Sequence, residues 1–177
     1  MDFIQQKDIN QSRGTSLLEL LIYIAILSGL MVVVTDAFTS LSKGRGQSQA
    51  KSEVNAAIRF ATEKIRQDLK GASAVATPVL GTSSSTLSMT IAGVTIIYDV
   101  SAGQLRRKEG AAAQVAVTGS NISVSAPTFT RLENYSTYSG QLNATTTAIQ
   151  VAMTMSYNSS STDWRYSDSL RTTVSLR

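Results

Sequence analysis

Residues 13–27 read RGTSLLELLIYIAIL, an apolar run that holds one carboxylate, Glu19, five residues after Gly14. Between Leu17 and Val34, only Glu19, Ser28 and Gly29 interrupt a string of apolar side chains. These 18 positions approach the roughly 20 residues that a helix needs to cross a bilayer. The apolar residues surround the helix instead of forming one stripe, which predicts contact with lipid or with other helices.

Glu19 needs an explanation, because a charge inside an apolar helix is costly and usually marks a functional position. One interpretation is local: Ser16 and Glu19 have the spacing of a capping box, in which glutamate satisfies backbone donors at the helix start. The other is that Glu19 pairs with a positive charge on another molecule. The two interpretations are compatible, and the sequence leaves both open.

The segment resembles a processing signal. A basic residue (Arg13), Gly14, two small or polar residues, two leucines, Glu19 and a long apolar run are the pattern of type IV prepilins and type II secretion pseudopilins. The resemblance implies that residues 1–14 are a leader, removed by a prepilin peptidase that cuts after Gly14 and leaves Thr15 as the N-terminus. The family usually has phenylalanine at that first mature position, where it is N-methylated, whereas this chain has Thr15.

Cleavage would give Glu19 a partner. It would create an α-ammonium group at the head of an apolar helix, where the Glu19 of a neighbouring subunit could neutralise it at weak dielectric screening. Such a pair would select one axial register, so we expect Leu17, Leu18 and Glu19 to act in assembly. The partners implied are other pilin or pseudopilin subunits, the prepilin peptidase and the cytoplasmic membrane, with no cofactor.

The residues on either side of the apolar run indicate how the chain would be oriented in a membrane. Lys7 and Arg13 precede the apolar run, which favours a cytoplasmic N-terminus and a C-terminal domain outside the cytoplasm. A secretory signal peptide is the alternative, but Thr35-Asp36-Ala37 is a poor cleavage site for one.

The rest of the helical region divides in two. We expect a transmembrane and assembly helix over 15–41, a kink or break at Lys43–Gly46, where two glycines weaken the helix, and an amphipathic helix over 47–70. Uninterrupted, 15–70 would measure on the order of 80 Å, so its second half must pack on a domain outside the membrane. The apolar stripe comprises Val54, Ala57, Ile58, Ala61, Ile65 and Leu69.

Residues 71–177 are predicted to form an antiparallel β-sheet. Residues 94–100 alternate, turn at 101–103 and continue into 104–108, which predicts a hairpin. Further strands are expected at 86–91, 122–130, 149–157 and 170–176. The fold class is therefore α+β, a long N-terminal helix packed on a C-terminal sheet, an order similar to the pilin fold.

Composition argues against an enzyme. The chain has no histidine and no cysteine, which removes the usual general base, the commonest zinc ligands and every thiol nucleophile. We expect no metal. The net charge of +4 is too modest to indicate nucleic-acid binding by itself.

Two other groups of residues have side chains that could bind a ligand. Arg106, Arg107 and Lys108 could contact phosphates at a hairpin tip, but strand alternation sends them to opposite faces, which favours an ordinary solvated strand. Asp163 and Asp168 could form a calcium loop, although they lack the spacing of one.

Three short segments, residues 66–69, 104–107 and 128–132, resemble minor pilins, including the J-type minor pseudopilin. The main alternative is a membrane-anchored binding protein that does not polymerise.

Overall fold

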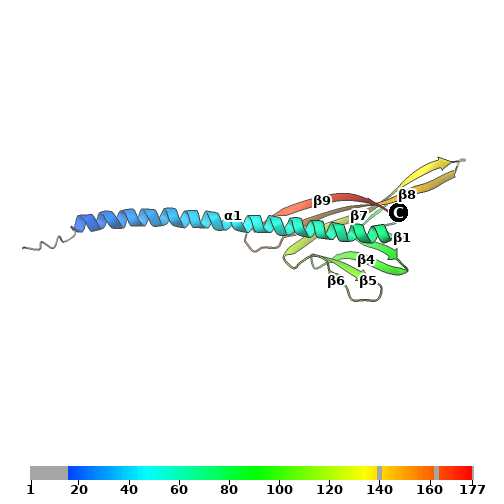
Figure 1. Cartoon of the computed structure of the whole chain (residues 1–177), viewed down its shortest axis with the longest axis horizontal. Helices are drawn as coiled ribbons and strands as arrows, with labels where there is room; N and C mark the ends of the chain where they lie inside the picture. The colour runs from blue at the N-terminus through cyan, green and yellow to red at the C-terminus, as the bar shows by residue number, and fades with distance from the viewer. Residues whose placement is uncertain (1–15, 139–140, 162–163, 177) are drawn as a thin grey trace, which may run out of the picture. The chain divides into compact units, whose positions relative to one another are not determined.

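The computed structural model describes residues 16–138, 141–161 and 164–176. The chain divides into two compact units, residues 1–42 and 43–177. Its one long helix, α1 (Leu17–Gly71), supplies the described part of the first unit and the helical layer of the second (Figure 1). The helix is long and apolar enough to cross a membrane.

α1 is continuous, so the break expected at Lys43–Gly46 is wrong. Gly46 is buried, and the indole of Trp164 occupies the place where a β-carbon of residue 46 would stand. Glycine therefore serves close packing at this position. The helix propensity that it costs, about 1 kcal/mol, is offset by packing of the second unit.

The second unit contains nine strands among its described residues. They are β1 (Ala74–Thr77), β2 (Ser83–Ser84), β3 (Leu87–Ile91), β4 (Val94–Ser101), β5 (Gln104–Glu109), β6 (Val115–Ala116), β7 (Ile122–Tyr138), β8 (Gln141–Tyr157) and β9 (Ser167–Ser175). All the pairs are antiparallel.

The expected hairpin at 94–108 is confirmed as β4–β5, with Tyr98 opposite Arg107 and Asp99 opposite Arg106. Its turn, Ala102-Gly103, has positive φ at both residues (52° and 72°), the geometry of the tight turn that matches strand twist. The other expected strands are also present, and β7 runs on from Thr130 to Tyr138.

The strands form two sheets, where a single sheet was expected. One has the order β1-β3-β4-β5-β6 and the other β2-β7-β8-β9. The division falls between β5 and β7, because β5 pairs with the short β6, whereas β7 pairs with β2 and β8. Among the described residues, hydrogen bonds from Val124 N to Gly103 O at 2.7 Å and from Arg131 Nη1 to the carbonyl of Val75 at 3.0 Å link the two sheets.

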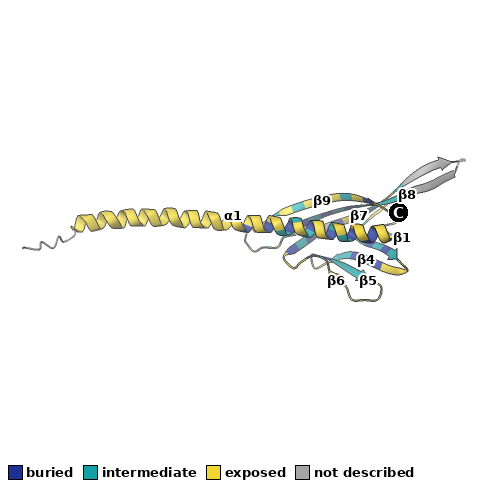
Figure 2. Cartoon of the chain, in the orientation of Figure 1, coloured by how far each residue is buried: buried dark blue, intermediate teal, exposed yellow. Residues whose placement is uncertain are grey.

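A single hydrophobic core joins the second half of α1 to both sheets. The predicted stripe is confirmed: Val54, Ile58, Ala61, Ile65 and Leu69 are buried, and Ala57 is packed against the core. Figure 2 shows these buried positions recurring along the second half of α1, while the first half is exposed throughout. The period matches the 3.6-residue turn of an amphipathic helix.

Candidate functional site

The first half of α1 is a continuous apolar surface. No residue in its most apolar 18-residue window is buried, and Leu17 and Leu18 are 81% and 69% exposed. Isolated exposed apolar residues are ordinary, but contiguous apolar surfaces of this kind mark interaction or membrane sites. This surface is the first candidate site.

Glu19 lies in the first turn of α1. Its carboxylate accepts a hydrogen bond of 3.3 Å from the hydroxyl of Tyr23, one turn further along the helix. The backbone carbonyl of Ser16 accepts from Leu20 N, so Ser16 is the N-cap residue that precedes α1. Within the described residues, the Glu19 side chain does not close a capping box with it. Glu19 is exposed, with an oxygen free to accept from a partner.

Four hydroxyl groups in this half of α1, those of Tyr23, Ser28, Thr35 and Thr39, are satisfied within the helix. Ser28 donates to the carbonyl of Ile24 at 2.7 Å, and Thr35 donates to that of Met31 at 2.8 Å. Such bonds to the preceding turn remove a polar group from an apolar surrounding. They make this surface more compatible with lipid than its sequence suggests.

The predicted processing residues, Gly14 and Thr15, lie outside the described residues. The structure therefore describes the helix that would follow a cut after Gly14, but not the cleavage site.

A second cluster lies in the unit of residues 43–177, where α1 meets the five-stranded sheet. One carboxylate oxygen of Asp68 accepts from the hydroxyl of Tyr98 at 2.6 Å and from Nε of Arg107 at 2.7 Å. Arg107 also donates to Glu109 at 2.6 Å, and Lys64 Nζ lies 3.9 Å from the other Asp68 oxygen. The Asp68 side chain is only 8% exposed. The cluster thus compensates a buried charge with charge-assisted hydrogen bonds.

The protonation of this cluster is fixed by its surroundings. Burial, followed by the hydrogen bond to Asp68, raises the pKa of Tyr98 well above its ordinary value. Burial lowers the pKa of Arg107, but the hydrogen bonds and charges of Asp68 and Glu109 outweigh it, and the pKa is raised. Tyr98 stays a neutral donor and Arg107 a cation, which is the arrangement of a structural ion pair.

The basic cluster of β5 is therefore divided. Arg107 lies on the face with buried Leu105 and points toward α1, held by Asp68 and Glu109. Arg106 and Lys108 are half-buried at the alternate positions. Alternation along β5 thus separates Arg107 from Arg106 and Lys108, and Arg107 is held in ion pairs with Asp68 and Glu109.

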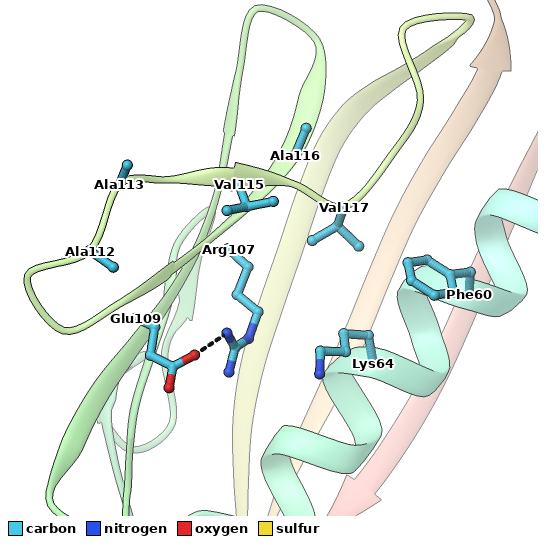
Figure 3. Close-up of a pocket in the computed structure, with 9 residues that line it drawn as sticks. All are labelled: Phe60, Lys64, Arg107, Glu109, Ala112, Ala113, Val115, Ala116 and Val117. Atoms are coloured by element: carbon cyan, nitrogen blue, oxygen red, sulfur yellow. Dashed lines mark hydrogen bonds and ion pairs between the residues drawn. The ribbon is translucent and has the colours of Figure 1, made fainter.

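Beside this ion pair is a small cleft, shown in Figure 3. It has a volume of about 320 Å³ and lies between α1 and the segment that leads through β6. Phe60 and Val115, each more than 60% exposed, line it with Val117 and three alanines, while Lys64, Arg107 and Glu109 supply its polar side. Its size is at the low end of the range for small-molecule sites.

Asp168, which with Asp163 lacks the spacing of a calcium loop, accepts a hydrogen bond from the backbone N–H of Ser169 at 2.8 Å. Asp163 lies outside the described residues. In the part of the chain that the structure describes, no three acidic side chains gather as a metal site would require.

Sequence reasoning missed the partnership of Asp68, Tyr98 and Arg107, although signals for it exist. Asp68 falls three residues after Ile65 on the buried stripe of α1, and Tyr98 shares the inward face of β4 with Ile96. A carboxylate on a buried face requires a partner, so its pairing could have been inferred.

Comparison with known proteins identified no matching family model, curated protein or solved structure.

Proposed function

We propose that this chain is a minor pilin or pseudopilin, a structural subunit of a type IV pilus or a type II secretion pseudopilus. It is made as a precursor in the cytoplasmic membrane and cut after Gly14 by a prepilin peptidase. It then assembles through the first half of α1 with homologous helices, as a tip or initiation subunit. Its role is structural, without catalysis.

The observation that carries this proposal is the complete exposure of an apolar helix that contains a carboxylate. From Leu17 to Ser42 every residue is exposed, so the apolar surface must be covered by something outside this chain. Lipid alone would cover the leucines, but it offers no favourable partner to Glu19. A bundle of similar helices with free α-ammonium ends would cover both.

The second half of α1 supports the same assignment. Its buried stripe anchors the helix to a folded domain, so the apolar half is held by one end and its surface remains open for other molecules. A subunit that assembles through a membrane helix while presenting a globular domain needs this division.

The test is the N-terminus of the mature chain. Expressed with an active prepilin peptidase, the protein should lose residues 1–14 and begin at Thr15, as read by N-terminal sequencing or intact mass. Without the peptidase it should keep Met1, and a Gly14→Leu variant should stay uncut in both cases. A chain that retains Met1 in the presence of active peptidase overturns the proposal.

The competing function is a single-pass anchored protein whose second unit binds a ligand, and the cleft at Phe60 and Arg107 favours it. Crosslinking separates the two. Because the chain has no cysteine, Leu27→Cys places one thiol on the apolar helix and Arg59→Cys places one on the exposed face of the second half. With a partner that carries an engineered cysteine in its own N-terminal helix and an added thiol oxidant, disulfides from Leu27→Cys, without those from Arg59→Cys, support assembly. A ligand in the cleft with no such crosslink supports the competing function.

A further inference from the structure

We propose that a cleft formed by Gln47, Ser48, Lys51 and Tyr166 binds the phosphate headgroup of a membrane phospholipid, with Trp164 beside it in the bilayer interface. The inference rests on the membrane insertion in the proposed function. It adds a lipid-binding surface on the unit of residues 43–177, distinct from the first half of α1, which assembles.

The chemistry of the cleft suits an anion. It has a volume of about 280 Å³, and its four lining side chains are an amide, a hydroxyl, an ammonium and a phenol, all of which donate hydrogen bonds. Gln47, Ser48 and Lys51 share one face of α1 by their spacing. Glu53, about 200° further round the helix from Lys51, accepts instead from Gln49 at 3.0 Å.

The neighbouring aromatic residue suits the membrane interface. Trp164 lies with one edge of its indole against Gly46 and is 38% exposed. Tryptophan and tyrosine are enriched at the level of lipid headgroups, where an apolar ring and a polar N–H or O–H are both accommodated. Trp164 and Tyr166 come from one connection, between β8 and β9, and both lie beside the first turns of the second unit.

Chain length places the cleft near the membrane. Leu41, 56% exposed, is the last large apolar residue of the first unit, and Gly46 follows five positions later. Even a fully extended chain would allow only about 18 Å over these five positions. Each headgroup layer is roughly 5–8 Å thick. Arg45 and Arg165, both exposed and next in sequence to Gly46 and Trp164, add positive charge.

The experiment uses the full chain in phospholipid vesicles, because Trp164 is the only tryptophan. Its fluorescence should be quenched more by a spin label on the lipid headgroup than by one deep in the acyl chain. Phosphatidylglycerol carrying the headgroup label should quench more than labelled phosphatidylcholine. Equal quenching by the two lipids, or greater quenching by the deep label, overturns the proposal.

Variants test the cleft itself. Lys51→Ala should reduce the preference for the anionic over the neutral lipid about fivefold, and Lys51→Arg should restore it. Lys70→Ala, which removes an exposed lysine from the other end of the same helix, should leave the preference unchanged. If inorganic phosphate abolishes the headgroup quenching, the cleft is a site for free phosphate and the proposal is wrong.

Flotation of the vesicles separates this inference from the proposed function. A chain that does not float with the vesicles contradicts both. A chain that floats and resists alkaline extraction, but whose Trp164 is quenched by iodide in water and not by the headgroup label, contradicts the lipid site alone.

Discussion

The indole of Trp164 lies against the backbone of Gly46, in the space where a side chain on residue 46 would begin. This contact ties the connection between β8 and β9 to α1 at the first buried position of the second unit. A glycine that weakens a helix in isolation thus becomes a packing position in the folded chain.

We predict that Gly46→Ala destabilises the second unit, whereas Gly44→Ala stabilises it. Alanine gains about 1 kcal/mol of helix propensity at either position. At Gly44 nothing lies within 4 Å of the added carbon, but at Gly46 the indole must move, and overpacking of this kind costs about 1–3 kcal/mol. Denaturant unfolding followed by circular dichroism gives both values.

The emission of Trp164 provides the second readout for this pair. Gly46→Ala should shift it to longer wavelength as the ring is displaced into water, and Gly44→Ala should leave it unchanged. Equal stabilisation by the two substitutions, with unchanged emission, would show that the indole does not pack on the helix.

This position also shows where the sequence misleads. The sequence predicts the stripe from Val54 to Leu69 and the alternation in β4 and β8, because each depends on a local period. The break at Gly44 and Gly46 was inferred from local propensity, and tertiary packing overrides that preference. The division into two sheets was not predictable either, because it depends on which distant strands pair.

We predict that Asp68→Ala destabilises the protein by about 3 kcal/mol or more, because it leaves Tyr98 without its acceptor and Arg107 with one partner fewer in a buried site. Glu63→Ala is the control: the Glu63–Arg66 pair on the same helix is exposed, with 3.7 Å between its atoms, and should be worth about 0.5 kcal/mol or less. Denaturant unfolding measures both.

A double-mutant cycle tests whether the cluster acts as a unit. Tyr98→Phe and Arg107→Ala remove two donors from the same oxygen of Asp68, so their effects should be coupled by about 0.5–3 kcal/mol. Additive effects would mean that the two hydrogen bonds form independently and that the cluster is not cooperative.

The raised pKa of Tyr98 predicts a loss of stability in alkali. Above about pH 10 the unfolded chain releases the phenolic proton while the folded chain keeps it, so the unfolding free energy falls as pH rises. The limiting slope for one group is about 1.4 kcal/mol per pH unit. Tyr98→Phe should remove this contribution, measured by denaturant unfolding at alkaline pH.

The control is a variant that loses a similar amount of stability at another position. It shows whether lower stability alone could change the alkaline slope. Met89→Ala, at a fully buried position of β3, should lower stability by a similar amount at every pH and leave the alkaline slope as in the wild type. An alkaline slope in Tyr98→Phe equal to that of the wild type would show that Tyr98 does not keep its proton.

Physical reasons also explain which parts of the candidate site could be predicted from the sequence. The sequence indicates Glu19 as a functional position because it is a carboxylate within an apolar run. It does not single out Asp68, because Asp68 is one of many charged residues in an amphipathic helix. Its burial depends on the angular position within the stripe, and its partners, 30 and 39 residues away, become neighbours only through the fold. The sequence therefore indicated the isolated charge and not the compensated one.

We predict that Glu19→Ala leaves cleavage after Gly14 intact but reduces incorporation into filaments by at least about tenfold, since removing one partner of a desolvated ion pair costs about 3–5 kcal/mol. Carbodiimide treatment of assembled filaments should join the Glu19 carboxylate to the α-amine of a neighbouring Thr15 as an amide, with loss of water. Asp36→Asn, which removes the other carboxylate of the first unit's helix, should retain this crosslink. Normal incorporation of Glu19→Ala would mean that Glu19 serves only its own helix, through the hydrogen bond from Tyr23.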